Sequence, residues 1–589
     1  MEQHCWPCAP STTRGRATLF DGRDNKLVFA SGRNIALVDV STLHTQLFTE
    51  HAQRTTTVRL SPDGTRAASA DASGAVKVWT LADRACSNTV PALAGAVRDI
   101  AWSADGSKIA CVGEGRGRLA RCFAADGQNS LGDFEGLSST TNSVAFTAVD
   151  AKLGVLVGSD DGAVKLYAGV PGPFSFSRSA LDADSKAFIN CVRVCPTNTQ
   201  LFAVASAQLK LHRLDGGSPA TLAGHTGSIL SVSFAPAGDH VASAGADKTV
   251  RLFDVQSTSQ THCFTLGAEV SDMQCGVLYL DDSALASVSL SGDVNLFDTR
   301  AKACRQTIKS HQKSVTALCC RGSDVMTADY EGAAVLTRRV DAPASVAGIR
   351  SGHTNAIIGM HASPSGALVS AGLDDTLRST LGTDVVKMQL PGAPSSLDVS
   401  LAELCVLVTT KGVCLAHKDK VVYTLPKLPS AATTACITAD GTQVAVGCED
   451  GSLRLYAVQA GSSLELTAPL PAKHRGAVTR MRFSPAGDML ATADADRAVY
   501  IWDVEKRETK ATGGRFHNSR VTALAWQSNG SRLASGGLDC AIFVWLPDEP
   551  AGKRVTINHA HRDGVSALGW VGEVLVSAGA DSCVRTWRV

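Results

Sequence analysis

Residues 224–254 read GHTGSILSVSFAPAGDHVASAGADKTVRLFD, and they contain one copy of the pattern that decides the fold. An alternating apolar run, Ile229 to Phe234, is followed by a Pro-Ala-Gly-Asp turn and a second run, His240 to Ala244. A Gly-Ala-Asp-Lys turn then leads into a third run, Val250 to Asp254. Because the apolar positions recur with a period of two and the breaks are short turns, the stretch predicts consecutive strands rather than a helix.

The same pattern returns fourteen times along the 589 residues, with a period of roughly 42 residues. The clearest copies end in an aspartate, five residues and an aromatic residue, as from Asp539 to Trp545 and from Asp581 to Trp587. This length and ending are typical of WD-type repeats, each of which forms one four-stranded blade of a β-propeller. The predicted third strands end near Val38, Trp79, Phe123, Tyr167, His212, Phe253, Phe297, Arg338, Thr380, Ala416, Tyr456, Trp502, Trp545 and Trp587.

Polar residues at fixed places in the repeat predict a hydrogen-bonded relay that holds each blade together. In the copy quoted above these are His225, Ser243 and Asp247, with Phe253 at the aromatic position. Acyl-transfer enzymes use the same residue types, but a catalytic triad occurs once, whereas these residues recur in blade after blade. The recurrence therefore favours a structural role. Two further complete sets are His517, Ser535, Asp539 and Trp545, and His561, Ser577, Asp581 and Trp587.

Fourteen blades exceed the four to eight that one propeller usually holds, so we expect two rings of seven. The predicted fold class is all-β, with two tandem seven-bladed WD-repeat β-propellers built from fourteen four-stranded blades. The predicted domains are 15–309 and 310–589. Copies ending at Arg338, Thr380 and Ala416 lack the aromatic residue, so their assignment depends on spacing.

The last repeat lacks its outer strand, because the sequence stops at Val589 directly after a third strand. Residues 1–14, MEQHCWPCAPSTTR, belong to no repeat. An open sheet edge is a liability that propellers suppress. We therefore expect residues 1–14, around Cys5 to Pro10, to supply the outer strand of the fourteenth blade.

The composition limits the classes of partner. The 56 Lys and Arg residues nearly balance the 55 Asp and Glu residues, and no long run of either sign is present, so nucleic acid is not expected as a partner. No apolar stretch reaches the length of a membrane span and the N-terminus has no leader pattern, so we expect a soluble, cytoplasmic protein without membrane contact. We also expect the protein to be a monomer.

The eighteen cysteines are scattered, many of them on predicted strands, as expected of small buried residues in a reducing compartment. Cys5 and Cys8 have the spacing of a redox motif or of half a metal site. No second cysteine pair and no βαβ pattern accompanies them, so we expect neither a metal nor a cofactor.

Enzyme signatures are weak. Residues 112–118, VGEGRGR, begin like a dinucleotide-binding loop, but Arg118 stands where the third glycine is needed and no helix follows. A catalytic propeller needs a carboxylate-rich central channel, whereas the predicted first strands are mostly small and apolar. We therefore expect no catalytic residues and no enzyme activity.

Several segments between the repeat motifs resemble the actin-interacting protein 1 family along essentially the whole chain. Segments of this kind are much rarer among WD-repeat proteins than the blade motif itself. They are Trp6-Pro7, Thr13-Arg14-Gly15, TEH at 49–51, VGEGR at 112–116, GSDD at 158–161, GPFSFS at 172–177, FINCVRV at 188–194, LASVSLSG at 285–292, GHTN at 352–355, LDDTLR at 373–378 and HAHRDGVSALGW at 559–570.

The resemblance implies a regulator of actin turnover that is not an enzyme. Proteins of this family bind actin filaments decorated with cofilin, also called actin-depolymerising factor, promote their disassembly and slow their regrowth. The family's functional surface lies on the first propeller, around blades three to five. The candidate protein-binding residues implied by this resemblance and by their neighbourhood are Glu114, Arg116, Asp160, Phe176, Lys186 and Phe188.

The match at this surface is incomplete. Ser175 stands where the family typically has a lysine, and Gly117 where it typically has an acid. Glu114, Arg116 and Lys186 are close enough in sequence to compensate. Because turns between second and third strands emerge on the same face as the loops that enter the next blade, 113–118, 160–161 and 180–188 should share one face.

Structural roles are the alternatives for some of these residues. Asp161 is interpreted as the turn aspartate of its repeat, Phe174 and Phe176 are equally consistent with packing between blades, and Phe188 is expected to be partly buried. The alternative function is that of a two-propeller scaffold subunit in a multi-protein assembly unrelated to actin.

Overall fold

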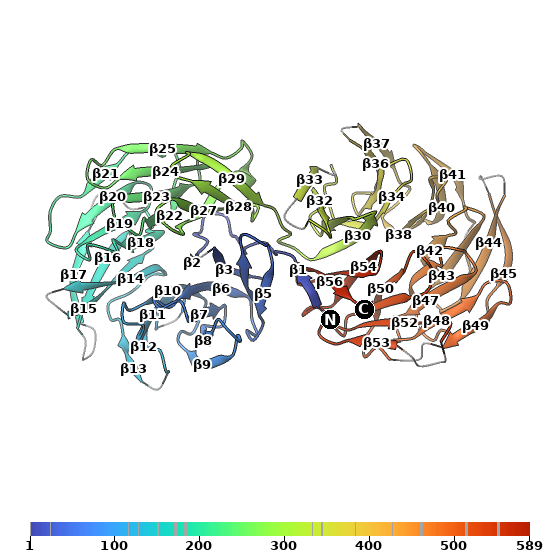
Figure 1. Ribbon diagram of the computed structural model, residues 1–589, viewed down its shortest axis with the longest axis horizontal. Coiled ribbons are helices and arrows are strands. Elements are labelled where there is room, and N and C mark those ends of the chain that lie inside the picture. Colours follow the sequence, from blue (N-terminus) through green and yellow to red (C-terminus); the bar gives the residue numbers. More distant parts are fainter. Residues whose placement is uncertain are drawn as a thin grey trace. The chain divides into compact units, whose positions relative to one another are not determined.

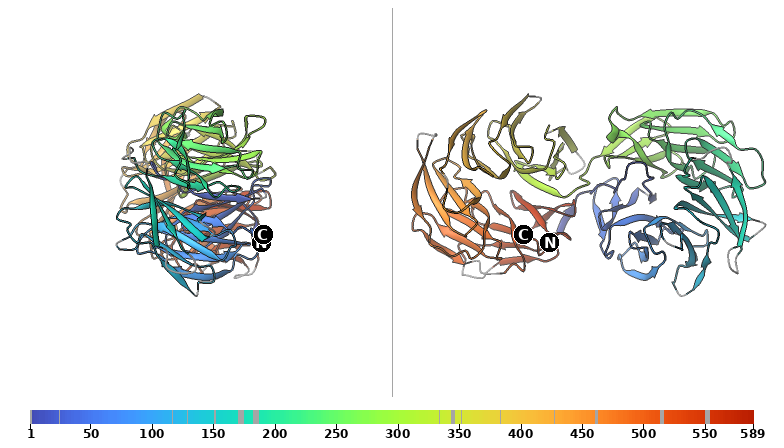
Figure 2. Two further views of the ribbon diagram at one scale, coloured as in Figure 1. Left: turned by 90° about the vertical axis from the view of Figure 1, so that its left-hand side faces the viewer. Right: turned by 180° about the vertical axis from the view of Figure 1, so that it is seen from behind.

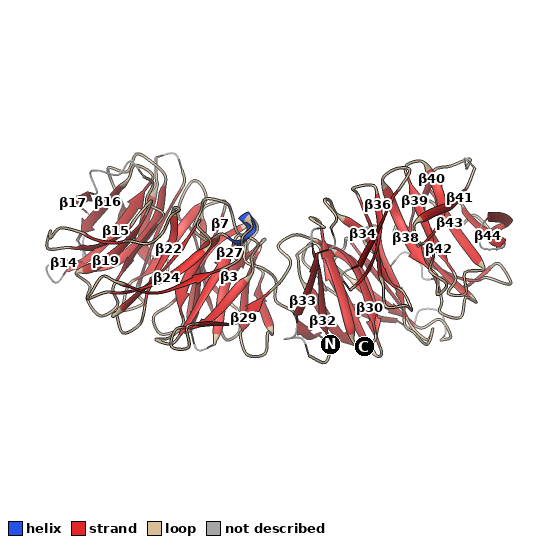
Figure 3. Ribbon diagram, turned by 90° about the horizontal axis from the view of Figure 1, so that it is seen from above, coloured by secondary structure: helices blue, strands red, loops and turns tan. Residues whose placement is uncertain are grey.

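The structure is a computed structural model that describes residues 2–23, 25–115, 117–127, 129–149, 152–169, 175–181, 187–332, 334–342, 346–350, 352–382, 384–426, 428–459, 463–512, 516–549 and 554–589. Within these residues the chain is all-β, and its strands form fourteen four-stranded antiparallel sheets. Figure 3 shows strand throughout, with one short helical turn, η1 (Val270–Asp272). No helix in the described part of the chain is long and apolar enough to cross a membrane.

Seven sheets, blades 1 to 7, come from the first half of the chain. Blade 1 contains β2 (Phe20–Arg23), β3 (Lys26–Ser31), β4 (Asn34–Asp39) and β5 (Thr45–Phe48). Blade 2 contains β6 (Thr55–Leu60), β7 (Arg66–Asp71), β8 (Ala75–Thr80) and β9 (Cys86–Pro91). Blade 3 contains β10 (Val97–Trp102), β11 (Lys108–Gly113), β12 (Ala120–Ala124) and β13 (Ser130–Asp133). Blade 4 contains β14 (Thr141–Val149), β15 (Lys152–Ser159), β16 (Ala163–Ala168) and β17 (Ser175–Leu181). Blade 5 contains β18 (Cys191–Val194), β19 (Leu201–Ala205), β20 (Leu209–Arg213) and β21 (Ala220–Leu222). Blade 6 contains β22 (Ile229–Phe234), β23 (His240–Gly245), β24 (Thr249–Asp254) and β25 (Gln260–Thr265). Blade 7 contains β26 (Gln274–Tyr279), β27 (Ala284–Ser289), β28 (Val294–Asp298) and β29 (Ala303–Ile308).

Seven further sheets, blades 8 to 14, come from the second half. Blade 8 contains β30 (Val315–Arg321), β31 (Asp324–Asp329), β32 (Ala334–Arg339) and β33 (Val346–Arg350). Blade 9 contains β34 (Ile357–Ala362), β35 (Leu368–Gly372), β36 (Thr376–Leu381) and β37 (Asp384–Gln389). Blade 10 contains β38 (Pro394–Val399), β39 (Leu404–Thr409), β40 (Gly412–His417) and β41 (Lys420–Thr424). Blade 11 contains β42 (Ala432–Ile437), β43 (Gln443–Cys448), β44 (Leu453–Gln459) and β45 (Ser463–Pro469). Blade 12 contains β46 (Val478–Phe483), β47 (Met489–Asp494), β48 (Val499–Asp503) and β49 (Glu508–Thr512). Blade 13 contains β50 (Val521–Trp526), β51 (Leu533–Gly537), β52 (Ile542–Trp545) and β53 (Arg554–Ile557). Blade 14 contains β54 (Val565–Val571), β55 (Val574–Gly579), β56 (Val584–Arg588) and β1 (Glu2–Cys5).

The first strands of neighbouring blades contact one another in turn and close two rings. In the first ring β26 of blade 7 contacts β2 of blade 1, and in the second β54 of blade 14 contacts β30 of blade 8. Figure 1 shows each ring by itself, β2 to β29 in one and β30 to β56 with β1 in the other. The fold class predicted from the sequence, two seven-bladed WD-repeat β-propellers, is confirmed, and each predicted third-strand end lies in a third strand.

Residue contacts divide the chain into two compact units, Pro7–Gln312 and Met1–Trp6 with Lys313–Val589. We call them the N-terminal propeller and the C-terminal propeller. The domains predicted from the repeats were 15–309 and 310–589, with 1–14 assigned to the second domain. The contacts instead assign the residues from Pro7 onward to the N-terminal propeller. The physical reason is hydrogen bonding, since the Ala9 amide donates to the His311 carbonyl at 3.2 Å and the Ser11 amide to the Ala30 carbonyl at 2.8 Å.

The outer strand of blade 14 comes from the other end of the chain. β1 pairs antiparallel with β56, with Glu2 opposite Trp587 and Cys5 opposite Arg585 (Figure 1). The two chain ends consequently lie beside each other, as Figure 2 shows. The predicted strand exchange is present, but the strand is Glu2–Cys5 and not the segment around Cys5 to Pro10. The reason is that the residues after Trp6 contact the N-terminal propeller instead.

Apolar side chains pack between neighbouring blades and form the core of each ring. Val76 and Val78 of blade 2, for example, share a cluster with Ile109 and Phe123 of blade 3, and all four side chains are buried. Burying each such side chain stabilises the fold by roughly 1.5–3 kcal/mol. The alternation seen in the sequence thus places one face of each strand toward each neighbouring blade.

The predicted relays are present in six blades within the described residues. In blade 13 the Trp545 indole donates to Ser535 Oγ at 2.9 Å, Ser535 Oγ lies 2.9 Å from His517 Nε2, and His517 Nδ1 lies 3.0 Å from Asp539 Oδ2. Equivalent His–Asp pairs are His51–Asp71, His225–Asp247, His353–Asp374, His474–Asp494 and His561–Asp581. The relay of blade 6 ends at its serine, because Phe253 has no donor with which to continue it.

Candidate protein-binding site

Glu114 and Asp160 occupy the same place in two neighbouring blades, directly after the second strand. The Glu114 amide donates to the Ala96 carbonyl at 2.9 Å, and the Asp160 amide donates to the Thr140 carbonyl at 2.9 Å. In both cases the acceptor directly precedes the first strand of the same blade. Both acidic residues therefore lie on the face at which the first strands begin, which we call the loop face.

A cavity of about 440 Å³ opens on the loop face of the N-terminal propeller and brings three of the candidate residues together. Glu114, Asp160 and Phe188 all line it. The other walls are the beginnings of β6, β10 and β14 and most of the N-terminal segment, which we define as residues 11–19 and of which Thr12 and Arg14 do not line the cavity. We call this space the loop-face cavity.

Glu114 is held by two guanidinium groups. Its Oε1 accepts a hydrogen bond from Arg98 Nη2 and lies 3.6 Å from Arg16 Nη1. The glutamate side chain is 39% exposed, so the carboxylate stays within reach of a partner. Arg16, which belongs to the N-terminal segment, was not among the residues identified from the sequence, and the repeat pattern contains no signal for it.

Asp160 is oriented by Asn142, a residue for which the repeat pattern likewise contains no signal. Asn142 Nδ2 donates to Asp160 Oδ1 at 2.6 Å and to the Ile189 carbonyl at 3.0 Å. Asn142 therefore joins the turn of blade 4 to the loop that carries Phe188.

Phe188 is 62% exposed, which corrects the expectation that it is partly buried. The neighbouring Ile189 is 1% exposed and packs closely on blade 4, because a Cβ added to Gly158 would lie 2.6 Å from Ile189 Cγ2. Successive side chains of extended backbone point in opposite directions, so burial of Ile189 turns Phe188 outward. An exposed aromatic ring beside carboxylates and guanidinium groups is suited to protein recognition.

The other candidate residues are placed only in part. Arg116 and Lys186 lie outside the described residues. The backbone of Phe176 lies in β17, opposite Tyr167, and its side chain lies outside the described part of the structure. Gly117, where the family typically has an acid, adopts a φ of +87° that a residue with a side chain rarely takes.

Asp161 has the structural role predicted for it. Its Oδ1 accepts a hydrogen bond from the Ala163 amide at 3.0 Å, and its Oδ2 accepts one from Lys165 Nζ at 3.1 Å. The carboxylate thereby stabilises the turn between β15 and β16. Asp160, one residue earlier, lines the loop-face cavity instead.

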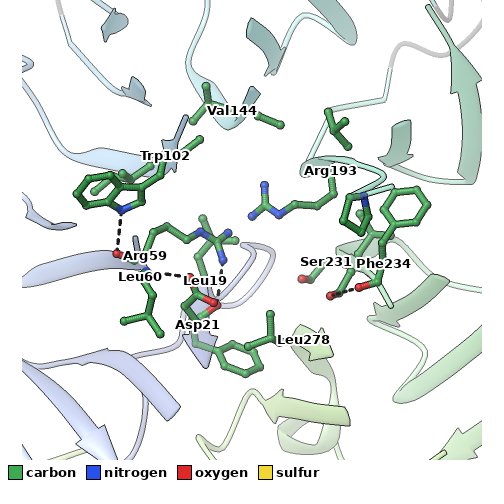
Figure 4. Close-up of a pocket in the computed structure, with 18 of the residues that line it drawn as sticks. Leu19, Asp21, Arg59, Leu60, Trp102, Val144, Arg193, Ser231, Phe234 and Leu278 are labelled. Carbon is green, nitrogen blue, oxygen red and sulfur yellow. Dashed lines mark hydrogen bonds between the residues drawn. The ribbon is translucent and has the colours of Figure 1, made fainter. Parts of the chain in front are cut away.

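A second cavity, of about 370 Å³, lies at the other end of the first strands of the N-terminal propeller (Figure 4). Figure 4 shows Arg59 and Arg193 entering this space from different blades. Both side chains form ion pairs with the fully buried Asp99, at 3.3 Å from Arg59 and 2.9 Å from Arg193. Burial alone raises the pKa of Asp99, but the two guanidinium groups outweigh it and lower the pKa.

The C-terminal propeller contains a similar polar group among its first strands. Asp398 Oδ1 is paired with Arg482 and lies 3.3 Å from His361 Nε2. Burial, with the nearby Arg482 charge, lowers the pKa of His361 to about 4. The prediction that the first strands are mostly small and apolar is therefore incomplete, since charged side chains cross both channels and link blades that are distant in sequence.

Cys5 and Cys8 are both buried, and Cys5 Sγ donates to the Trp6 carbonyl. Within the described part of the chain, no group of three or more His, Cys, Asp or Glu side chains is arranged to hold a metal ion. The thiols of Cys111 and Cys275 have pKa values raised to about 12 by burial, which keeps them in the unreactive thiol form.

Comparisons with known proteins identify both the repeats and relatives of the whole chain. Residues 41–80, 216–254, 468–503 and 513–545 match the family described as WD domain, G-beta repeat. The chain is 30% identical over 604 residues to WD repeat-containing protein 1 of Xenopus tropicalis, covering 98% of both chains. It is 31% identical over 614 residues to Actin-interacting protein 1-2 of Arabidopsis thaliana, covering 99% of this chain and 98% of that one. It is 30% identical over 610 residues to Actin-interacting protein 1 of Drosophila melanogaster, covering 98% and 96%.

Proposed function

The chain belongs to the family of WD repeat-containing protein 1 and actin-interacting protein 1, and from this premise we propose that it binds actin filaments and promotes the disassembly of filaments decorated with cofilin. The observation that carries the proposal is the full-length relationship to proteins named for actin interaction. The chain matches them over nearly all of both sequences, so the relationship includes the segments that form both propellers of this chain.

The loop-face cavity supports the N-terminal propeller as the binding site. Glu114, Asp160 and Phe188 come from three different loops, yet they line one cavity. An exposed aromatic ring provides apolar contact area, and the charged groups beside it can orient a partner through charge complementarity. We include Phe176 in the proposed surface through the family resemblance, and Arg116 and Lys186 through their proximity in sequence to Glu114 and Phe188.

We further propose that the protein acts without catalysis, as a monomer in the cytoplasm on the actin cytoskeleton, and without binding nucleic acid, membranes or a cofactor. Binding energy, rather than bond chemistry, would then drive disassembly, because a protein that prefers a weakened filament conformation shifts the equilibrium toward it.

The test is co-sedimentation with actin filaments, with and without cofilin, followed by a disassembly assay at fixed cofilin concentration. We expect Asp160→Ala and Phe188→Ala each to weaken binding to decorated filaments about tenfold, which corresponds to about 1.4 kcal/mol. Circular dichroism and melting should stay unchanged, since Phe188 is exposed and Asp160 accepts only one side-chain hydrogen bond.

Two variants provide matched controls. Val270→Ala removes an exposed apolar side chain from the loop that enters blade 7. Phe188 is likewise an exposed apolar side chain, in the loop that enters blade 5. Glu449→Ala changes the residue of blade 11 that occupies the place of Asp160, since its amide donates to Ala431 at 2.9 Å. Binding of both controls should equal that of the parent. If the parent protein does not bind cofilin-decorated filaments, the proposed function is wrong. If Asp160→Ala and Phe188→Ala both retain full activity, the proposed binding site is wrong.

A further inference from the structure

The N-terminal segment forms a wall of the loop-face cavity, although it belongs to no repeat. Ser11, Thr13 and residues 15–19 line the cavity together with Asp160 and Phe188, and Arg16 Nη1 lies 3.6 Å from Glu114 Oε1. Nothing in the motif comparison or in the repeat pattern assigned this segment to the binding site.

Hydrogen bonds to blades 1 and 7 fix the segment in place. Thr12 Oγ1 donates to the Leu290 carbonyl at 2.6 Å, and Gln312 Nε2 donates to Thr12 Oγ1 at 2.9 Å. The Gly32 amide donates to Ser11 Oγ at 2.9 Å, and the Thr18 amide donates to the Cys275 carbonyl at 2.8 Å. A segment held at both ends is ordered before a partner arrives, so binding costs less conformational entropy.

Guanidinium groups outnumber carboxylates in the lining of the cavity. Three guanidinium groups, those of Arg16, Arg54 and Arg98, line it together with the carboxylates of Glu114 and Asp160. The chain's own side chains already hold both carboxylates, Glu114 through Arg98 and Arg16 and Asp160 through Asn142.

Donors remain available after these internal contacts are counted. Among the residues that the structure describes, the exposed Arg54 side chain forms no ion pair or hydrogen bond. Arg16 is 51% exposed and meets one carboxylate oxygen, so most of its five N–H donors face the cavity or solvent. Thr56 Oγ1 and Arg98 Nε are buried without a hydrogen-bond partner in the described structure.

We propose that the loop-face cavity binds an acidic side chain on a short segment of the filament partner, with Arg16 of the N-terminal segment and Arg54 of blade 2 as its charge partners. Guanidinium groups match carboxylate geometry, and charge complementarity across the rim accelerates association and orients the partner. Phe188, which also lines the cavity, supplies apolar contact for the residues beside the acidic one. This inference deepens the proposed function and rests on it.

The test reverses single charges and measures binding to cofilin-decorated filaments. Arg16→Glu and Arg54→Glu should each weaken binding at least tenfold at low salt, and the difference from the parent should shrink as salt rises, because screening removes the electrostatic part. Arg14→Glu is the matched control, since Arg14 is an exposed neighbour of Arg16 that does not line the cavity. It changes the net charge equally and should bind within twofold of the parent.

The outcomes separate this inference from the function on which it rests. A parent that fails to bind decorated filaments overturns the proposed function, and the cavity proposal falls with it. If the parent binds, and Arg16→Glu and Arg54→Glu bind as the parent does, the acidic-segment proposal alone is wrong. Equal weakening by Arg14→Glu would also overturn it, because the effect would then come from net charge. Melting temperatures of all three variants should match the parent, which shows that the fold is intact.

Discussion

Trp6→Ala tests how the two ends of the chain close the C-terminal propeller. Trp6 is 2% exposed and packs in a cluster with Val315 and Val325 of blade 8 and Val576 and Val584 of blade 14. Its amide also donates to the Val584 carbonyl at 2.9 Å. The indole therefore joins the first and last blades of this ring directly after β1.

The expected cost follows from this burial. Replacing a buried tryptophan by alanine leaves a cavity and destabilises a protein by roughly 3–5 kcal/mol. The guanidinium of Arg338, 4% exposed and 5.8 Å from the indole centroid, loses its aromatic neighbour as well. For a propeller of this size, the melting temperature should fall by about 10 °C.

The assay is differential scanning calorimetry of the full chain, in which two compact units are expected to give two transitions. Limited proteolysis with mass spectrometry assigns each transition, because fragments from 313–589 appear when the C-terminal propeller unfolds. Trp6→Ala should lower this transition and leave the other unchanged. Trp102→Ala is the matched control, since Trp102 lies in β10 of the N-terminal propeller and should lower only the other transition. Equal shifts of both transitions, or no shift, would refute the closure by Trp6.

Three further predictions concern the blades themselves. Asp539→Ala should lower the free energy of unfolding by about 1–3 kcal/mol in urea titrations, because it removes the acceptor of a buried hydrogen-bond relay, and unchanged stability would contradict the structural role. Burial alone would raise the pKa of Asp581, but His561 beside it outweighs this and holds the pKa at about 2, so about 2 kcal/mol of stability should be present above pH 4 and be lost as the pH falls toward 2. The free energy of unfolding of Asp581→Asn should lack this pH-dependent loss. A pH profile equal to that of the parent would refute the assignment to Asp581. The exposed Cys304 should react with maleimide well before Cys436, whose pKa burial raises, and peptide mapping that finds Cys436 labelled first would contradict the packing.

Local signals in the sequence were sufficient for the blades. A strand's alternation, its turns and the aspartate that precedes an aromatic residue all lie within one repeat, so each repeat reports its own structure. The copies without an aromatic residue were still placed correctly by spacing, and Arg338 lies in β32 as expected. The relay of blade 13 was likewise identified as a set, because its members recur at fixed positions.

The lining of the loop-face cavity, the candidate binding site, could be predicted only in part. The motif resemblance suggested Asp160 and Phe188, and its neighbourhood suggested Glu114. All three line one cavity, but the lining residues Arg16, Arg54 and Asn142 were missed. The exposure of Phe188 was also mistaken, because the choice of which neighbour turns inward depends on the fit of Ile189 against Gly158 of another blade. No periodicity within one repeat contains that information.

The sequence by itself determined the class of fold, the number of blades and the relays, because these depend on residues a few positions apart. Only the tertiary structure decided which strand completes blade 14. It also decided that Asp99 pairs with Arg193, 94 residues further along the chain, and that the N-terminal segment borders the loop-face cavity. The physical reason is ring closure. When seven sheets meet around one axis, the beginnings of their first strands converge, and side chains from separate repeats then satisfy one another's charges and hydrogen bonds at distances that no linear spacing specifies.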